Sequence, residues 1–177
     1  MNQFDNIIEN LTSRSYIGFN DSEMHPQGRA HNKVLHISIQ LCTKILSRVL
    51  SDTGSALNVL PKSILMKLTL DGVVTRPSST IVKAFDGSQS TVFGEVDLPV
   101  KIVPHMFYIT FQLMDIEPAY TCLLGRPWIY AAGAVTSTLH QKLKFLVEGR
   151  LVMIDGEEDI FVSHIDSYRY IVRMKTA

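Results

Sequence analysis

The chain has 177 residues, 46% of them hydrophobic, and its 17 lysines and arginines balance its 17 aspartates and glutamates, so the formal net charge is zero. A balanced charge argues against the basic surface that nucleic acids and anionic membranes attract, and no apolar run reaches the roughly 18 residues that span a bilayer. The N-terminus lacks the apolar core of a signal peptide. We therefore expect an intracellular, cytoplasmic protein without nucleic-acid or membrane partners, long enough for one domain with tails.

The hydrophobicity pattern divides the chain into three parts. Residues 1–31 are polar and lack a sustained period, which is typical of a leader or linker, although residues 4–11 are compatible with a short amphipathic helix. Residues 32–155 carry regular patterns and form the predicted domain. Residues 156–177 begin acidic and end basic, and we interpret them as a C-terminal tail or linker.

The predicted domain begins with two strands and a helix. Residues 35–41 alternate apolar and polar side chains, which is the pattern of a half-buried strand. Residues 45–50 form a second apolar stretch, which we predict to be the next strand. Residues 61–68 begin with a proline and place their apolar side chains on one face, so they predict a helix of two turns.

The remaining elements are mainly strands. Residues 91–103 and 107–113 alternate strongly, and only 127–132 predicts a further short helix. Two glycine-containing turns join flanking strands into hairpins: Asp86-Gly87 lies between 81–85 and 90–93, and Glu148-Gly149-Arg150 lies between 143–147 and 151–154. The sequence therefore predicts a mainly β fold with one or two short helices.

The stretch Asp52-Thr53-Gly54-Ser55 places an acid between two apolar segments, where an unpaired charge is costly. It resembles the active-site signature of aspartic proteases, in which two carboxylates share one proton. One carboxylate acts as base on a water, while its protonated partner polarises the scissile carbonyl. Gly54 allows close backbone approach, and the hydroxyls of Thr53 and Ser55 are able to hold the carboxylate by hydrogen bonds. The triplet alone is also an ordinary turn sequence.

A second motif favours the catalytic interpretation over the turn. Cys122 and Leu123 lead into Leu124, Gly125 and Arg126, which repeat the theme of apolar residues followed by glycine. This stretch is similar to the motif that retroviral proteases carry just before their helix, where its strand crosses the catalytic loop.

The predicted hairpin between the two motifs occupies the sequence place of the flap that covers substrate in those enzymes. We assign Phe85, Asp86, Gly87 and Ser88 to this flap and to the substrate cleft. A simpler interpretation makes Asp86 a turn former, and a core position for Phe85 is an equal alternative.

Three longer stretches carry a more specific resemblance. ALNVLPKSILMKL, RPSSTIVKAFDGSQSTVFGEVDLPVKI and AYTCLLGRPWIYAAGAVTSTLHQKLKF resemble the protease region of plant Ty3/gypsy-type retrotransposon polyproteins. The similarity extends over about residues 30–165. It implies the small closed β-barrel of the retropepsin (acid protease) type.

The resemblance also implies an activity and a partner. Because the chain holds one such triplet, an active enzyme would be a homodimer in which each copy supplies Asp52 at a two-fold axis, with the two Thr53 residues interlocking beneath it. The implied activity is that of an aspartic endopeptidase that hydrolyses a retrotransposon-type polyprotein and needs no cofactor or metal.

The sequence departs from the family pattern at several positions. Ser51 stands where a branched apolar residue is usual. Ala56 stands where retroviral enzymes have an acid that pairs with the arginine of the second motif, so Arg126 needs another partner. Pro127 directly after Arg126 also differs, although proline suits a helix start.

The remaining candidate side chains have simpler interpretations. Cys42 and Cys122 are too few for a disulfide framework, and we expect both to be reduced. The histidines in the first part of the chain match no zinc-binding spacing. We expect Trp128 to pack a helix onto the barrel.

Three hypotheses about function remain open from the sequence. The first is an active homodimeric endopeptidase. The second is a catalytically silent retropepsin-like module that dimerises or binds peptide, which Ser51 and Ala56 favour. The third is a non-functional remnant that folds poorly.

Overall fold

The structure is a computed structural model that describes residues 17–68, 72–78, 80–83, 86–158 and 168–171. The helix considered for residues 4–11 lies outside these ranges. Among the described residues, neither α-helix has the length and hydrophobicity that crossing a bilayer requires.

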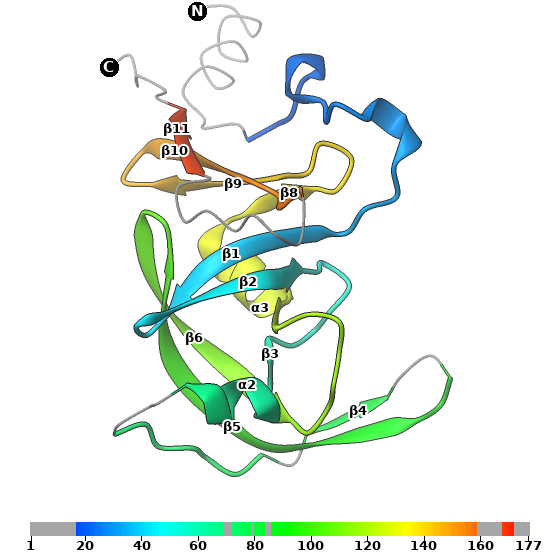
Figure 1. The fold of residues 1–177 in the computed structure, drawn as a ribbon. Coiled ribbons are helices and arrows are strands. Elements are labelled where there is room, and N and C mark those ends of the chain that lie inside the picture. Colours follow the sequence, from blue (N-terminus) through cyan, green and yellow to red (C-terminus); the bar gives the residue numbers. More distant parts are fainter. Residues whose placement is uncertain (1–16, 69–71, 79, 84–85, 159–167, 172–177) are drawn as a thin grey trace, which may run out of the picture.

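A closed β-barrel forms the body of the molecule (Figure 1). Six strands follow one another around it in the order β1-β2-β7-β3-β6-β5, and pairing of β1 with β5 closes the ring, while β4 adds to the outer edge of β5. The strands are β1 Leu35–Leu41, β2 Lys44–Ser51, β3 Val59–Pro61, β4 Ile81–Lys83, β5 Gln89–Ile102, β6 His105–Met114 and β7 Cys122–Leu124.

Alternation of side chains decides which face of each strand is buried. In β1 every second residue is buried, and the same period runs through β5 from Val92 to Ile102. Because successive side chains of a strand point to opposite faces, this pattern fixes the register as well as the face. The strands predicted over 35–41, 91–103 and 107–113 are thereby confirmed.

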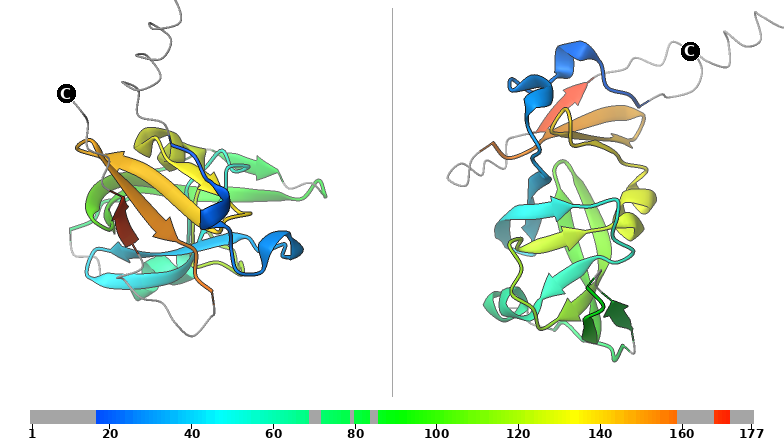
Figure 2. Two further views of the ribbon diagram at one scale, coloured as in Figure 1. Left: turned by 90° about the horizontal axis from the view of Figure 1, so that it is seen from above. Right: turned by 90° about the vertical axis from the view of Figure 1, so that its right-hand side faces the viewer.

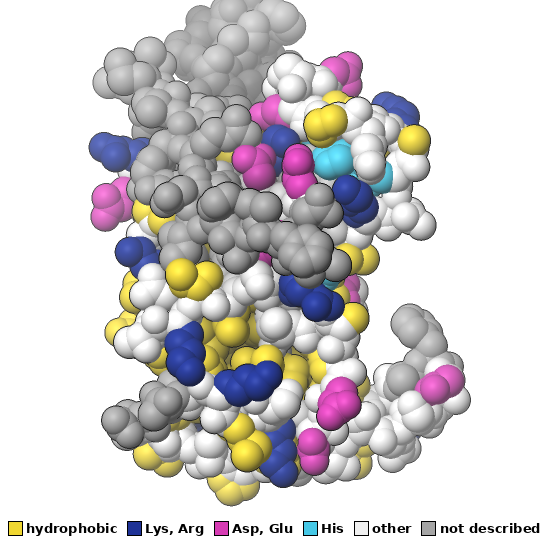
Figure 3. Space-filling model, viewed as in Figure 1, with side chains coloured by type: hydrophobic (Ala, Val, Ile, Leu, Met, Phe, Trp, Pro, Cys, Tyr) yellow, Lys and Arg dark blue, Asp and Glu magenta, His cyan; other side chains and the backbone are white. Residues whose placement is uncertain are grey.

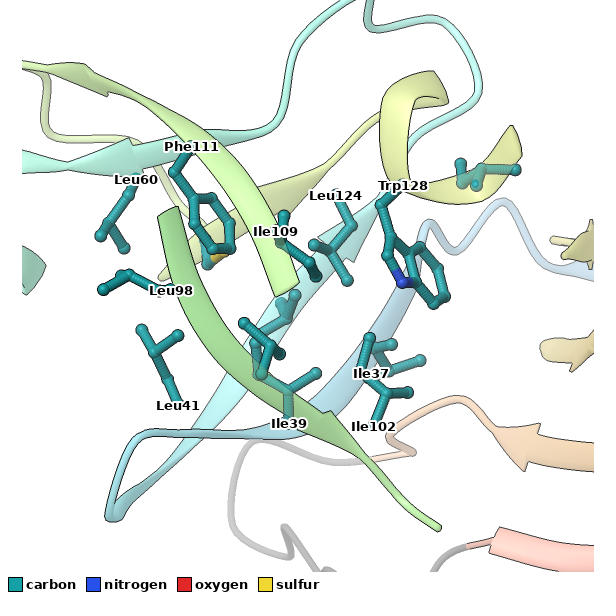
Figure 4. Packing of buried hydrophobic residues seen from close by; sticks show 14 of the residues in the cluster. Ile37, Ile39, Leu41, Leu60, Leu98, Ile102, Ile109, Phe111, Leu124 and Trp128 are labelled. Carbon is teal, nitrogen blue, oxygen red and sulfur yellow. The ribbon is translucent and has the colours of Figure 1, made fainter. Parts of the chain in front are cut away.

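The barrel interior is filled by aliphatic side chains, several of which are fully enclosed (Figure 4). Burying one such side chain contributes about 1.5–3 kcal/mol. At one end of the core the ring of Phe107 meets the rings of Trp128 and Phe145 edge to face, with centroids 5.6 and 5.7 Å apart. Trp128 therefore packs its helix onto the barrel, as the sequence predicts.

Each of the two short helices has a proline at its start. Helix α2 Lys62–Lys67 follows Pro61, and helix α3 Arg126–Ala132 carries Pro127 in its first turn. Helix α3 ends at Gly133, whose φ of 61° is the left-handed conformation that glycine adopts without strain. Both predicted helices are confirmed. Two single 3-10 turns, η1 Asp21–Glu23 and η2 Gly28–Ala30, precede the barrel.

A second, antiparallel sheet covers one end of the barrel (Figure 2). Its strands lie in the order β11-β10-β9-β8 and comprise β8 Val135–Ser137, β9 Lys142–Val147, β10 Arg150–Asp155 and β11 Tyr168–Ile171. Leu143, Phe145, Val152 and Ile154 of this sheet join the barrel core. The hairpin predicted around Gly149 is confirmed as β9–β10.

The segment before the barrel is attached to this second sheet. Lys144 on β9 is only 3% exposed, and its Nζ donates to Glu23 Oε1 at 2.6 Å and to the Gly18 carbonyl at 2.8 Å. The same ammonium lies 4.6 Å from the centre of the Phe19 ring. A buried lysine needs such compensation.

The domain boundaries at residues 31 and 155 stay a prediction.

Candidate active site

Asp52 lies near the surface at the end of strand β2. The strand runs parallel to β7, with Ser51 opposite Leu124, and the Asp52 N–H donates to the Leu124 carbonyl at 3.0 Å. Asp52 is half-buried directly after the last residue of β2. Its backbone is therefore held by the barrel while its carboxylate stays reachable.

The turn after Asp52 is organised by the Asp52 carboxylate. Its Oδ1 accepts the N–H of Gly54 at 2.8 Å, and a Cβ on Gly54 would lie 3.0 Å from the same oxygen. The Ser55 hydroxyl instead donates to the Leu57 carbonyl at 2.8 Å and accepts the Leu57 N–H at 3.2 Å. Within one chain the carboxylate is thus oriented by a backbone donor rather than by the Ser55 hydroxyl, and Thr53 is exposed.

The second glycine motif lies directly against this turn. The N–H of Arg126 donates to the Ser55 carbonyl at 2.9 Å. A Cβ added to Gly125 would lie 2.2 Å from the Leu57 carbonyl oxygen and 2.8 Å from that of Ser55. Such distances exclude any side chain there. The structure therefore brings together Asp52 and the motif formed by Leu124, Gly125 and Arg126.

Asn58 is a structural residue of the site that the sequence reasoning missed. It is 4% exposed, its Oδ1 accepts the Gly125 N–H at 2.9 Å, and its amide donates to the Thr110 carbonyl at 3.2 Å. One side chain thus joins the segment after Asp52 to the second motif and to β6. The sequence clue to its role is that Asn58 is the one polar residue in the otherwise apolar run 56–60.

The departures from the family pattern have visible consequences. In the part of the chain that the structure describes, no acidic side chain forms an ion pair with Arg126, and Ala56 is exposed. The hydroxyl of Ser51 is buried and has no hydrogen-bond partner among the described residues. A buried polar atom without a partner is costly.

The hairpin expected to act as a flap extends β5 beyond the barrel (Figure 1). Strand β4 pairs with β5 from Ile81 opposite Thr91 to Lys83 opposite Gln89. At the turn Asp86 Oδ1 accepts the Ser88 N–H at 2.8 Å, and these hydrogen bonds with Ser88 hold the pKa of Asp86 below its usual range. Gly87 has a φ of 84°. Phe85 lies outside the described residues.

An apolar cluster connects this hairpin to the segment around Asp52, and we call it the second cluster. It contains the buried residues Val59, Val92, Met114 and Leu123, against which Leu50, Leu57, Val82, Ile116 and Tyr120 pack. Burial raises the pKa of the Tyr120 phenol, and the nearby Asp52 carboxylate adds to the effect. Tyr120 thus belongs to the surroundings of Asp52, although the sequence reasoning did not single it out.

The surface shows neither a large patch of one charge on the face in Figure 3 nor a metal-binding cluster among the described residues. Figure 3 shows acidic and basic side chains interspersed on one face, with hydrophobic side chains between them over the barrel. Over the ranges that the structure describes, no three His, Cys, Asp or Glu side chains come together as a metal site. Cys42 and Cys122 are free thiols.

Comparison with known proteins supports the fold. No protein-family model and no curated protein sequence matches the chain. The retroviral protease-like domain of Ddi1 from Leishmania major superposes with a TM-score of 0.51 at 14% identity, covering 65% of this chain and 90% of that one. EIAV protease in complex with the inhibitor HBY-793 superposes with a TM-score of 0.51 at 19% identity, covering 61% and 96%. The chain therefore has a retropepsin-like fold, with a closed six-strand barrel and two short helices.

Proposed function

We propose that the protein is an aspartic endopeptidase that works as a homodimer. The observation that carries the proposal is the half-exposed Asp52 carboxylate, oriented by the Gly54 N–H in a loop that packs against Gly125 within a retropepsin-like barrel. One chain contributes one such aspartate, so the pair requires a second copy related by a two-fold axis. In this dimer the exposed Thr53 side chain of each copy contacts that of its mate.

In this dimer the two Asp52 carboxylates share one proton, because like charges about a hydrogen bond apart do not both ionise. The ionised carboxylate takes a proton from a water, whose oxygen attacks the scissile carbonyl carbon. The protonated carboxyl donates to the carbonyl oxygen. Collapse of the tetrahedral species breaks the C–N bond as the amine leaving group takes a proton from the carboxyl that received it from the water. No metal or cofactor enters this route.

The substrate in this proposal is an extended polypeptide with apolar side chains. The second cluster supplies an apolar surface between Asp52 and the β4–β5 hairpin, and the strands of that hairpin offer backbone groups for pairing with an extended chain. The sequence resemblance suggests a polyprotein of the retrotransposon type as the natural substrate, cleaved in the cytoplasm.

The test is cleavage of a denatured protein across about pH 3.5–7, the range in which a carboxylate pair is singly protonated. Wild-type protein is compared with Asp52→Asn and with Asp115→Asn, an exposed acid outside the site. We expect a bell-shaped profile for the wild type and for Asp115→Asn, and no cleavage by Asp52→Asn at unchanged thermal stability. Cleavage retained by Asp52→Asn would exclude the mechanism.

A catalytically silent dimerising or peptide-binding module is the second candidate. The orphaned Ser51 hydroxyl next to Asp52 and the unpaired Arg126 favour it, since both weaken the support of the loop as the described residues show it. A wild-type protein that sediments as a dimer, binds an apolar peptide and cleaves nothing would select this candidate.

A further inference from the structure

Strand β2 contains a strained bulge four residues before Asp52. Ile37 pairs with Val49 and Ile39 with Leu46, so Ser38 of β1 faces two residues of β2. The second of these, Arg48, has a φ of 58°. This left-handed conformation is unfavourable for a residue with a side chain and persists only where its surroundings impose it.

Glu157 is the residue that meets this bulge. Both of its carboxylate oxygens accept the Arg48 N–H, at 3.1 Å each, and Oε1 also accepts the Ser38 hydroxyl at 2.6 Å. Its own N–H donates to the His36 carbonyl at 2.8 Å. The extra N–H that the bulge removes from the ladder is thus satisfied by a side chain that follows β10, far along the sequence.

The other side of the bulge holds the loop that precedes β7. The Arg48 guanidinium donates to the Ala119 carbonyl, and the Arg48 carbonyl accepts the Thr121 N–H at 3.0 Å. The Thr121 hydroxyl donates to the neighbouring Ser47 carbonyl. Both residues that flank Tyr120 are therefore bound to the bulge. Tyr120 itself packs on the second cluster, as do Leu50 and Leu57, which lie shortly before and after Asp52 in the chain.

We propose that Glu157 is a positioning residue of the candidate active site, which fixes the Arg48 bulge and through it the place of Tyr120 beside Asp52. The proposal rests on the proposed function as far as catalysis is concerned, but the placement of Tyr120 is a property of the chain itself. Residues 156–158, which the sequence analysis assigns to the C-terminal tail, thereby help to hold the candidate active site in place. Gly156 allows this, because a Cβ there would lie 2.9 Å from Leu35 Cδ1.

The experiment compares Glu157→Ala with Glu158→Ala in the full chain. Glu158 is the adjacent, exposed acid and makes no hydrogen bond or ion pair with the bulge among the described residues, so it is a matched control. Ring-labelled tyrosine is observed by NMR, and Tyr120→Phe assigns the signal. The KM and kcat for an apolar peptide are measured in parallel.

We expect Glu157→Ala to shift the Tyr120 signal, to lower the pKa of its phenol towards the ordinary value, and to raise KM several-fold with little change in kcat. Glu158→Ala should leave all three unchanged. If Glu157→Ala does not fold, Glu157→Gln gives the same comparison, because it keeps one acceptor oxygen and should produce a smaller shift. A loss of global stability alone would lower the active fraction without moving KM.

An unmoved Tyr120 signal in a folded Glu157 variant would overturn the proposal, as would an equal shift in Glu158→Ala. A wild-type protein without peptidase activity would remove the proposed function and leave the NMR comparison to decide the role of Glu157. The two failures are thus distinguishable.

Discussion

The side chain of Asn58 accepts the backbone N–H of Gly125 at 2.9 Å and so joins the loop after Asp52 to the second glycine motif. This contact is buried, and the same amide also donates to the Thr110 carbonyl on β6. The position of the loop after Asp52 therefore depends on one side chain with two hydrogen-bond partners.

Replacing Asn58 with alanine should destabilise the fold by about 1–3 kcal/mol, because it leaves buried backbone groups of Gly125 and Thr110 without these partners. Urea unfolding monitored by Trp128 fluorescence measures the change. Asp115→Ala is the control, since this exposed acid is held among the described residues by an exposed ion pair with Lys62 at 3.8 Å and should change stability by less than about 0.5 kcal/mol. Equal effects of the two substitutions would contradict the assigned role.

Gly125→Ala should displace the loop after Asp52. The new methyl group would lie 2.2 Å from the Leu57 carbonyl oxygen, so backbone has to move, at a cost of about 1–3 kcal/mol or more. We expect lower thermal stability and loss of any peptidase activity. Gly18→Ala is the matched control, because a Cβ there meets nothing within 4 Å. A Gly125→Ala protein as stable as the Gly18 variant would show that the contact is relaxed in solution.

The strands and helices were predictable wherever one period ran through a buried element, as in β1, β5 and α3. The two sequence motifs of the candidate site, at 52–54 and 124–126, were recognisable because each is local in sequence, and their catalytic role stays a prediction. The role of Asn58 and the contact of Glu157 with Arg48 were not, since they join residues that only the folded barrel brings together. The attachment of residues 18–23 to Lys144 was missed for the same reason.

The contacts of His25, which lies beside His31 before the barrel, predict that the folded state loses stability at acid pH. His25 Nδ1 accepts the Gln27 N–H at 3.2 Å, and its ring lies 4.9 Å from that of His31. Burial lowers the pKa of His25, and the positive charges of His31, Lys33 and Lys142 lower it further, against the opposing charge of Glu158. The folded state therefore resists protonation of His25.

Below pH about 6.5 the unfolded chain binds a proton at His25 that the folded chain does not, so stability falls as the pH is lowered. Thermal melts between pH 7.5 and 5 should show a smaller decline for His25→Asn than for the wild type. His105→Asn, which changes an exposed histidine, should follow the wild-type curve. A wild-type melting temperature that rises on acidification in this range would refute the assignment.

Asp97 on β5 is expected to have an unusually low pKa. Arg76 donates to both oxygens of Asp97, at 2.6 and 3.1 Å, and to Glu95 at 3.0 Å. These bonds from Arg76, with a further one from Thr110, lower the pKa of Asp97 to about 2. The stabilisation by this carboxylate is present above its unfolded pKa of about 3.9 and is lost as the pH falls towards 2.

Arg76→Ala should return the pKa of Asp97 towards its ordinary value, as measured by carboxyl-carbon NMR titration. Thr110→Val should produce a smaller rise, because it removes the second donor only. Arg29→Ala, in the segment before the barrel, serves as the control. A titration of Asp97 that Arg76→Ala leaves unchanged would show that the ion pair is not maintained in solution.

The closure of the barrel has a consequence for how the chain folds. The ladder that closes it joins Gln40 to Lys101 and Leu41 to Val100, whereas β5 and β6 pair along nearly their whole length. A hairpin between neighbouring strands forms early because it closes a short loop, whereas the short ladder between β1 and β5 must bring together residues far apart in the sequence. The seam is therefore expected to be the last part of the barrel to form and the first to open. The Cys42 N–H donates across this seam to the Pro99 carbonyl at 3.3 Å, and its amide exchange should accordingly precede that of the β5–β6 hairpin.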